Sequence, residues 1–277
     1  MAISEPRWSG LRGCWSGTCG GTRASGRCSR ISGGCTPVGK ADLHLHTRVS
    51  DGFATVEELL EWVEHATDLD VIAVTDHEDV RGGLRARELA ARRSYRFDVI
   101  PGAEITTLQG HVLALFVERD LPSFRGVEST LAMIHDAGGI AIAPHPLSWL
   151  TRSVGRRTLD SLRERAEAGV QFDAIELANP SPAGVRTGAK AARLNAELWR
   201  LPATGSSDAH HLEHVGSGWT EFPGRTAAEL RQAIADGTTR AAMRHPSAVP
   251  AGRLALGLAW GYTATPRKVV RMLGGRR

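Results

Sequence analysis

The sequence predicts an α/β fold in which strands and helices alternate around a mostly parallel sheet. From residue 40 onward, short apolar runs are followed by amphipathic stretches, which is typical of repeated strand and helix units. The chain of 277 residues, 42% of them hydrophobic, can bury the core of one such domain. Strand count alone does not separate a closed barrel from an open doubly wound sheet.

Seven apolar runs have the length and the bounding polar residues of strands. The predicted strands are Ala41–His46, Val71–Thr75, Asp98–Glu104, His111–Val117, Ile140–Pro144, Ala174–Leu177 and Pro202–Ser206.

Six amphipathic stretches between and after these runs predict helices. The first, Thr55–Ala66, opens with a capping box, because Thr55 is followed three residues later by Glu58. Its apolar residues recur at helical spacing and predict a buried stripe. The other helices are expected at Leu84–Arg93, Ser129–Asp136, Leu159–Ala168, Val185–Trp199 and Ala227–Ala235.

Basic residues are concentrated at the two ends of the chain. Residues 1–39 contain five Arg and one acidic residue, and residues 240–277 contain eight Lys or Arg and no acidic residue. The part between them holds 21 basic and 29 acidic residues, although the whole chain has a formal net charge of +4. The body is therefore acidic, as suits a cation site, and the core gives no indication of nucleic-acid binding.

Composition divides the chain into three segments. All four cysteines lie in the Gly-, Ser- and Arg-rich residues 1–39, which lack a hydrophobic period and the CxxC pairs of a zinc ribbon, so a disordered extension is expected there. Residues 40–246 form the expected catalytic domain. Residues 247–277 form a basic amphipathic tail that suits contact with an anionic membrane surface or with nucleic acid. Without a secretory signal, a cytoplasmic location is expected.

Two histidines on the first predicted strand indicate a metal site. His44 and His46 are two residues apart in ADLHLHTRVSD. Alternate residues of a strand face the same side, so both imidazoles would point to one place. A structural histidine pair is the alternative interpretation.

Other residues that commonly bind metals lie at the ends of the later strands. In an α/β barrel the carboxyl ends of the strands meet at one face, where such folds place their sites. His111 precedes its strand, so it reaches that face only if residues 106–110 form a tight turn. The candidate metal ligands are His44, His46, Asp51, His77, Glu104, His111, His145, Asp208 and His210.

These nine donors predict more than one metal ion. Carboxylates buried together without compensating cations are strongly unfavourable. Imidazole and carboxylate ligands without thiolates suit manganese, zinc or iron. Nine donors exceed what one ion needs, so two or three divalent ions are expected.

Six motifs in collinear order resemble those of the PHP domain, named for polymerase and histidinol phosphatase. They are HLH at 44–46, SDG at 50–52, TDH at 75–77, GAE at 102–104, PHP at 144–146 and SDAH at 207–210. The resemblance extends over roughly residues 41–222. It implies a distorted seven-stranded (β/α)7 barrel of PHP type with a trinuclear metal centre, and it identifies residues 40–246 as a PHP metallohydrolase domain.

The resemblance also implies how the donors divide among three ions. The implied sets are His44, His46, Glu104 and Asp208 for the first ion, Glu104, His111 and His145 for the second, and Asp51, His77 and His210 for the third. Asp51 is a carboxylate where some relatives have histidine, which resembles the nucleotide phosphoesterase branch more than the histidinol phosphatase branch.

The function implied by the resemblance is hydrolysis of a phosphoric ester by a hydroxide that bridges the ions. The expected substrate is a small phosphorylated metabolite, a nucleotide or an oligonucleotide end. Three alternatives remain open. They are hydrolysis of a carboxylic ester, amide or carbamate at the same site, a noncatalytic scaffold, and nucleic-acid processing in which the basic tail is an electrostatic arm.

Two residues outside the ligand set are predicted to be catalytic. Arg48 lies in the first motif loop, and its guanidinium could meet phosphate oxygens in a bidentate fork, with Arg152 and Arg186 as further candidates. Asp76 precedes a candidate ligand, and we expect its carboxylate to orient a neighbouring imidazole rather than bind metal.

Three tryptophans have predicted positions. Trp149 follows the PHP motif directly and is a candidate for the wall of the pocket. Trp62 and Trp199 fall within predicted helices and are expected in the core.

Overall fold

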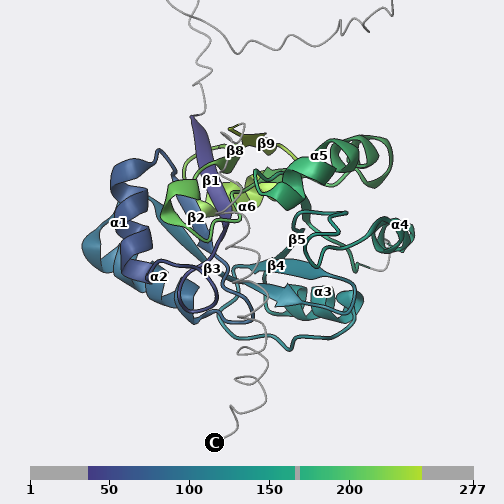
Figure 1. Cartoon of the computed structure of the whole chain (residues 1–277), viewed down its shortest axis with the longest axis horizontal. Helices are drawn as coiled ribbons and strands as arrows, with labels where there is room; N and C mark the ends of the chain where they lie inside the picture. The colour runs from purple at the N-terminus through teal and green to yellow at the C-terminus, as the bar shows by residue number, and fades with distance from the viewer. Residues whose placement is uncertain (1–36, 166–168, 245–277) are drawn as a thin grey trace, which may run out of the picture. The chain divides into compact units, whose positions relative to one another are not determined.

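The fold was determined from a computed structural model that describes residues 37–165 and 169–244. The strands in this part of the chain are β1 (Val38–Leu45), β2 (Val71–Val74), β3 (Asp98–Thr106), β4 (His111–Leu115), β5 (Ile140–Ala143), β6 (Ala174–Ala178), β7 (Ala203–Gly205), β8 (Gly218–Pro223) and β9 (Arg240–Met243). They form one mixed sheet in the order β7-β6-β5-β4-β3-β2-β1-β8-β9 (Figure 1).

The seven predicted strands correspond to β1–β7, but the expected total of seven is wrong. Among the described residues there are nine strands, because β8 pairs antiparallel with β1 and β9 pairs antiparallel with β8. The sequence of β9, RAAM, is short and only partly buried, so it lacks the apolar run used to recognise a strand. In β8, GWTEFP, buried and half-buried positions alternate, but the sequence has no apolar run that would predict a strand.

The sheet curves until β7, at one end of the strand order, approaches β8 and β9 at the other end. In β7, the backbone N–H of Gly205 donates to Thr220 Oγ1 of β8 at 3.0 Å, and that hydroxyl donates to the Gly205 carbonyl at 2.8 Å. A Cβ at Gly205 would lie 2.4 Å from the carbonyl oxygen of Trp219, so the close approach requires glycine. The expected distorted, barrel-like α/β fold is therefore confirmed.

All six predicted helices are present. They are α1 (Val56–Ala66), α2 (Arg81–Arg93), α3 (Val127–Asp136), α4 (Arg156–Glu164), α5 (Pro182–Leu194) and α6 (Ala227–Ala235). The predicted capping box of α1 forms, with Glu58 N–H donating to Thr55 Oγ1 at 3.2 Å and Thr55 N–H donating to Glu58 at 2.8 Å. The predicted Val185–Trp199 helix divides into α5 and a π-helical turn, Asn195–Trp199.

Apolar side chains from the sheet pack against helices in separate clusters. Along β2, Val71 and Ala73 share a cluster with α6, whereas Ile72 and Val74 share another with α1 and α2. This period of two follows from the alternation of side chains along a strand. The core thus holds β1 and β2 rigidly beneath the loops at their carboxyl ends.

The two tryptophans predicted for the core differ. Trp199 is buried, and its Nε1 donates to Asp160 at 2.8 Å. Trp62 is 36% exposed, because the buried stripe of α1 is made by Val56, Leu59, Leu60 and Val63 on another face of the helix.

The predicted segment boundaries are only partly within the described residues. Val38 pairs with Pro223 in the sheet, so β1 starts two residues before the expected boundary at residue 40. Residues 1–36 and the tail at 247–277 lie outside the described residues, and the expectations for them stay predictions. Within residues 37–165 and 169–244, no helix combines the length and apolar character that crossing a bilayer requires.

Candidate metal centre

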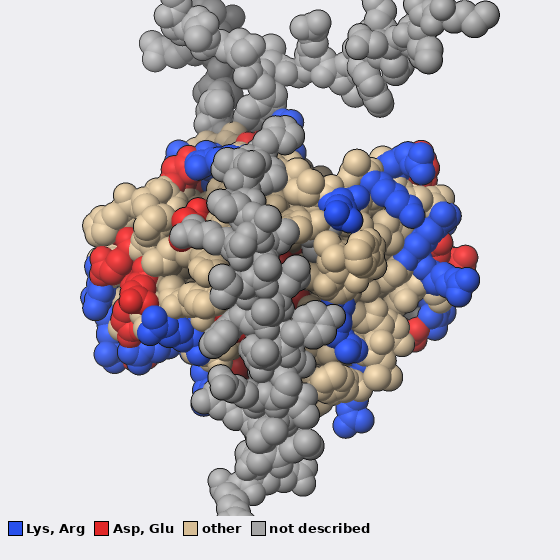
Figure 2. Space-filling model, viewed as in Figure 1, with Lys and Arg blue, Asp and Glu red and all other residues tan. Residues whose placement is uncertain are grey.

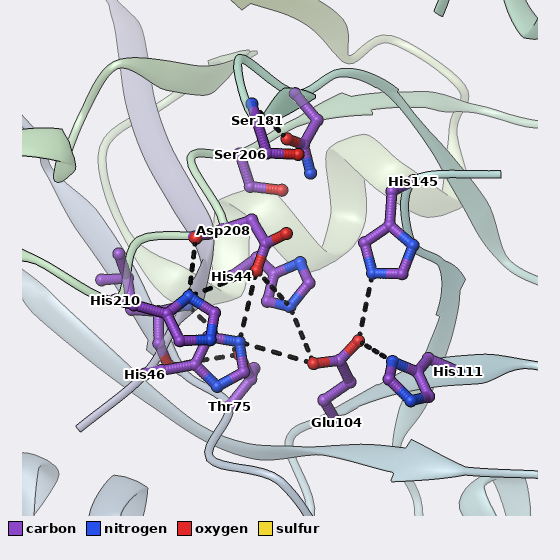
Figure 3. Close-up of polar contacts among 12 residues, drawn as sticks. His44, His46, Thr75, Glu104, His111, His145, Ser181, Ser206, Asp208 and His210 are labelled. Carbon is purple, nitrogen blue, oxygen red and sulfur yellow. Dashed lines mark hydrogen bonds and ion pairs between the residues drawn. The ribbon is translucent and has the colours of Figure 1, made fainter. Parts of the chain in front are cut away.

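The structure brings the nine predicted donors together. Figure 3 labels seven of them, all except Asp51 and His77. The nine donors come from six segments, in or next to β1–β5 and β7. Figure 3 shows Glu104 between two groups of imidazoles, with His44 and His46 on one side and His111 and His145 on the other.

Glu104, in β3, is the centre of the cluster. Its Oε1 lies 2.7 Å from His111 Nδ1 and 3.2 Å from His145 Nε2. Its Oε2 lies 3.2 Å, 3.4 Å and 3.3 Å from ring nitrogens of His44, His46 and His77, respectively. One buried carboxylate therefore contacts five imidazoles.

The carboxylates of Asp51 and Asp208 contact the other side of the histidine group. Asp51 lies 3.5 Å from His46 Nδ1, 3.6 Å from His77 Nε2 and 3.5 Å from His210 Nε2. Asp208 Oδ1 lies 3.4 Å from Nε2 of both His44 and His46.

The backbone of two donors is in the left-handed region that side chains other than glycine rarely adopt. Asp208 has φ of 54° and His145 has φ of 31°. Such conformations cost free energy and persist only where the surrounding structure enforces them. Both donors follow the last residue of a strand closely, so the bend aims their side chains at the cluster.

A tight turn between β3 and β4 brings His111 into the cluster. Such a turn is needed because His111 lies at the start of its strand rather than at the end. β3 and β4 pair antiparallel with Thr106 opposite His111, and Thr107 N–H donates to the Gly110 carbonyl at 2.9 Å. Gly110 has φ of +141°, and a Cβ there would lie 2.4 Å from the carbonyl carbon of Ser153. The turn therefore needs glycine at this position.

Four groups of donor atoms have the spacing of metal sites, with all ligand atoms of a group within 4.8 Å of one another. The groups are His46, Asp51, His77 and His210; His44, His46 and Asp208; His44, Glu104 and His145; and His77, Glu104 and His111. The three residues implied for the third ion, Asp51, His77 and His210, thus fall in one group, which also contains His46. The set implied for the second ion is divided between two groups, although Glu104 Oε1 faces both His111 and His145.

The donor geometry fits divalent metal ions. Most of the nitrogen–oxygen distances are 3.2–3.6 Å, which is longer than a charge-assisted hydrogen bond of about 2.7–2.9 Å. Two ligands that are each about 2.1 Å from a tetrahedral ion lie about 3.4 Å apart. In addition, both ring nitrogens of His46 are buried without a hydrogen bond among the described residues. Unsatisfied buried nitrogens facing carboxylates are what a bound cation would satisfy.

Charge in the cluster favours ionised carboxylates. Burial would raise the pKa of Glu104, but the surrounding histidines, His111 first, hold it well below its usual range. For Asp51, burial is likewise outweighed by His77 and His210, and the pKa is lowered. Burial, reinforced by His210, lowers the pKa of His46 and keeps its imidazole neutral. Ionised carboxylates and neutral imidazole are the forms that bind metal.

Glu176, which was not among the candidates predicted from the sequence, contacts two of the donors, His44 and His145. It lies in β6, is fully buried, and accepts hydrogen bonds from the backbone N–H of His145 and from Asn179 Nδ2, both at 2.7 Å, and from the hydroxyl of Ser206. Its Oε1 lies 3.3 Å from His44 Nδ1. A carboxylate on the second nitrogen of a metal-binding histidine fixes the ring and its tautomer. The only sequence feature that points to Glu176 is its position as a single acidic residue within the apolar run AIELA.

Asp42 holds the loop that carries Asp208. It lies in β1 and accepts from the backbone N–H groups of Ser207 and Gly216, both at 2.9 Å. Burial raises the pKa of Asp42 to about 6, although these hydrogen bonds oppose the shift. The sequence analysis did not predict a role for Asp42. The only sequence feature that points to it is its place as an acidic residue next to Ala41 and Leu43 in ADLHLH.

The hydrogen bonds of Asp76 go to the loop that follows β1, and its predicted catalytic role stays a prediction. Its Oδ1 accepts from the backbone N–H of Thr47 at 2.8 Å and the hydroxyl of Ser50 at 2.6 Å, and its Oδ2 accepts from the Thr47 hydroxyl at 2.6 Å. Among the described contacts, none of its hydrogen bonds goes to an imidazole. Asp76 instead fixes the loop that carries Asp51.

Arg48 is exposed at the other side of this loop. Its Nε donates to the Phe53 carbonyl at 2.8 Å. The pKa of Glu58, at the start of α1, is lowered mainly by its hydrogen bonds with Thr55, and the charge of Arg48 makes a smaller contribution in the same direction. In the part of the chain that the structure describes, its side chain makes no hydrogen bond with the donors. A catalytic role for Arg48 stays a prediction.

Sequence comparisons identify relatives over parts of the chain. A family model described as PHP-associated matches residues 189–239. An uncharacterized protein of Methanocaldococcus jannaschii is 34% identical over 132 residues, which cover 44% of this chain and 75% of that protein. The 5'-3' exoribonuclease Rnm of Salmonella typhimurium is 36% identical over 90 residues, which cover 30% of each protein.

A structural comparison agrees with these relatives. A two-domain protein from Bacteroides vulgatus that contains a predicted PHP-like metal-dependent phosphoesterase matches with a TM-score of 0.59 and 19% sequence identity. The match covers 75% of this chain and 65% of that one, and at this identity it shows a shared fold. From the six collinear motifs, the barrel-like sheet and these relatives, the chain belongs to the PHP, or polymerase and histidinol phosphatase, domain family.

Proposed function

We propose that this protein is a metal-dependent phosphoesterase. The observation that carries the proposal is the position of Glu104, whose two oxygens contact five imidazoles from four separate segments of the chain. Such a polar cluster is too costly to bury for structural reasons alone, and its donor spacing suits shared divalent ions.

The nine donors are the proposed ligands of two or three divalent ions, with manganese, zinc or iron as the metals that suit this ligand set. Glu104 is the proposed bridging ligand, because its two oxygens face different groups of histidines. Ions bound here would supply a hydroxide nucleophile at neutral pH and would neutralise charge on the phosphoryl oxygens.

The chain's own residues keep this site ready for substrate. Glu176 contacts His44 Nδ1 and leaves His44 Nε2 directed at Glu104 and Asp208. Asp76 and Asp42 hold the two loops that carry Asp51 and Asp208. Donors positioned before binding lose little entropy when an ion or a substrate arrives.

The proposed substrate is a small phosphorylated metabolite, a nucleotide or an oligonucleotide end. Two features support this range over a carboxylic ester or an amide. The exoribonuclease Rnm matches residues of this chain at 36% identity, and Asp51 is a carboxylate like that of the nucleotide phosphoesterase branch.

Metal content and substrate screening test the proposal. The full chain is purified, its bound metals are measured per chain, and phosphate release is assayed with manganese, zinc or iron. The substrates are nucleoside monophosphates, nucleoside 3′,5′-bisphosphates and short 5′-phosphorylated oligonucleotides, with a carboxylic aryl ester as the comparison. The expected result is more than one ion per chain and metal-dependent phosphate release. Less than one ion per chain after reconstitution, or hydrolysis of the carboxylic ester alone, contradicts the proposal.

A further inference from the structure

The loop between β5 and α4, residues 147–154, is attached directly to the candidate site. The hydroxyls of Ser153 and Thr151 lie 2.7 Å and 3.2 Å from His145 Nδ1. The carbonyl of Arg152 accepts from the backbone N–H of His111 at 2.7 Å. The base of the loop is thus fixed to two proposed ligands of the metal centre.

The same loop carries Trp149 on its outer side. Trp149 is 73% exposed, although a tryptophan gains much free energy from burial. It lies two residues from Thr151, so its Cα is within about 7.6 Å of the Thr151 Cα, given 3.8 Å between consecutive Cα atoms. An exposed indole next to the site contributes little to folding and is available to a ligand.

An arginine accompanies this indole. The guanidinium of Arg186, near the start of α5, lies 5.8 Å from the centre of the Trp149 ring, within the range of a cation–π contact. Figure 2 shows Lys and Arg side chains gathered over α4 and α5, the helices that follow this loop and β6. Through its contact with Arg186, Trp149 lies next to this basic surface.

Arg152, in the same loop, forms a second pair of this kind with Phe124. The Arg152 guanidinium lies 6.0 Å from the ring centre of Phe124, and both side chains are exposed. Of the seven large apolar side chains exposed among the described residues, four lie in loops that are bonded to the site segments: Phe53, Leu108, Phe124 and Trp149. Exposed aromatic rings are thus concentrated at this end of the protein.

We propose that Trp149 and Arg186 form a subsite for a nucleobase that flanks the scissile phosphate. The base stacks on the indole, and Arg186 and Arg152 pair with phosphates next to the base. Base stacking on an exposed aromatic ring with arginine nearby is how proteins bind single-stranded nucleic acid without reading its sequence. This subsite rests on the proposed phosphoesterase function and narrows it, because it selects a short single-stranded oligonucleotide over a small phosphorylated metabolite.

Equilibrium binding tests the subsite without relying on turnover. The 5′-phosphorylated thymidine dinucleotide and its counterpart with an abasic first residue are titrated into the metal-free full chain by calorimetry. The dinucleotide should bind the wild-type chain at least about fivefold more tightly than the abasic ligand, since stacking contributes on the order of a factor of five to one hundred. Trp149→Ala should remove this preference, and Trp149→Phe should keep most of it.

A matched control removes an exposed tryptophan elsewhere. Trp62→Ala, on the outer face of α1, should leave binding of both ligands unchanged. Arg186→Ala should weaken the binding of the dinucleotide and the abasic ligand alike, because both carry the phosphates. Equal affinity of the wild-type chain for the two ligands, or an unaltered preference in Trp149→Ala, overturns the subsite.

Activity measurements separate this inference from the function on which it rests. Deoxyribose 5-phosphate offers the phosphate ester without a base. If the loaded wild-type chain hydrolyses it while Trp149→Ala raises only the KM for the dinucleotide, both proposals are supported. If the preference for the dinucleotide is found in binding but no phosphate ester is hydrolysed, the phosphoesterase fails and the base-binding surface remains.

Discussion

At the scale of single residues, the candidate site depends on buried carboxylates that each hold several histidines. Substituting His44→Ala or Asp208→Ala should abolish phosphate release, because each side chain contacts Glu104 or a histidine at the centre of the cluster. Far-ultraviolet circular dichroism should show that the fold is kept. His65→Ala is the control, since His65 is 74% exposed on α1 and contacts only Glu61 among the described ion pairs. Wild-type turnover in either site variant would refute the ligand assignment.

Glu176 should act on the metal centre only through its neighbours. Glu176→Gln keeps the size of the side chain but replaces one acceptor oxygen by an NH₂ group. If the NH₂ group takes the place of Oε2, it faces the backbone N–H of His145. If it takes the place of Oε1, it faces His44 and the Ser206 hydroxyl. Substitutions of such supporting carboxylates typically cost 10–100-fold in metal affinity or activity, and we expect a loss of about that size. Competition with a chelator measures the affinity. Glu221→Gln, at a half-buried site in β8, is the control, and equal affinities in the two variants would show that Glu176 has no such role.

The clustering of the nine candidate donors could be predicted from the sequence, whereas the residues that support them could not. His44, His46 and Asp208 lie in short motifs at strand ends, where polar residues have no structural reason to gather. Glu176 and Asp42 are each the single acidic residue of their strand, and a single acid carries no periodic signal. The contact of Glu176 with His44 spans 132 positions and the hydrogen bond from Ser207 to Asp42 spans 165, which no local pattern encodes.

At the scale of elements, the β3–β4 hairpin positions a donor through one glycine. Gly110→Ala should destabilise the protein by about 1–3 kcal/mol, since a Cβ there meets the backbone of Ser153 and φ is +141°. The displaced turn should also weaken metal binding, because it carries His111. Gly126→Ala is the control, since nothing lies within 4 Å of a Cβ at that position. Denaturant midpoints of both variants, measured with and without metal, test the prediction; equal midpoints would contradict it.

Helices were easier to predict than the last strands. Each helix has an apolar stripe, and α1 and α6 both form capping boxes that define their first residue. β8 and β9 have no such boundary signal. β8 pairs with β1, which is distant in sequence, and β9 pairs with β8. The ends of the barrel-like sheet are therefore determined by tertiary contacts rather than by local propensity.

At the scale of the whole molecule, the charge of the site should make the metal-free protein sensitive to pH. The carboxylates of Glu104 and Asp51 have lowered pKa values, so the stability they provide is present above their unfolded values of 4.5 and 3.8 and is lost as the pH falls. His210 has a pKa raised to about 9 because Asp51 outweighs burial, so its contribution is complete below 6.5 and is lost as the pH rises toward 9.

The metal-free chain should therefore be most stable between about pH 5 and 6.5 and should weaken on both sides. Metal replaces the proton in these ion pairs, so the loaded chain should keep its stability up to pH 9 and should gain further stability with the concentration of free metal. Urea midpoints measured from pH 4 to 9, with chelator and with metal, test both statements. An unchanged midpoint of the metal-free chain between pH 6 and 9 would contradict the first.

The bond between Ser207 and Asp42 spans 165 positions of the sequence, and Asp208 is the neighbour of its donor. A growing polypeptide emerges from the ribosome with its amino end first, so the early histidines are synthesised long before their late acidic partner. Contacts this remote form slowly and only once nearly all of the barrel has been made. An interrupted translation product that ends before Ser207 consequently lacks Asp208 and His210, two of the nine clustered donors.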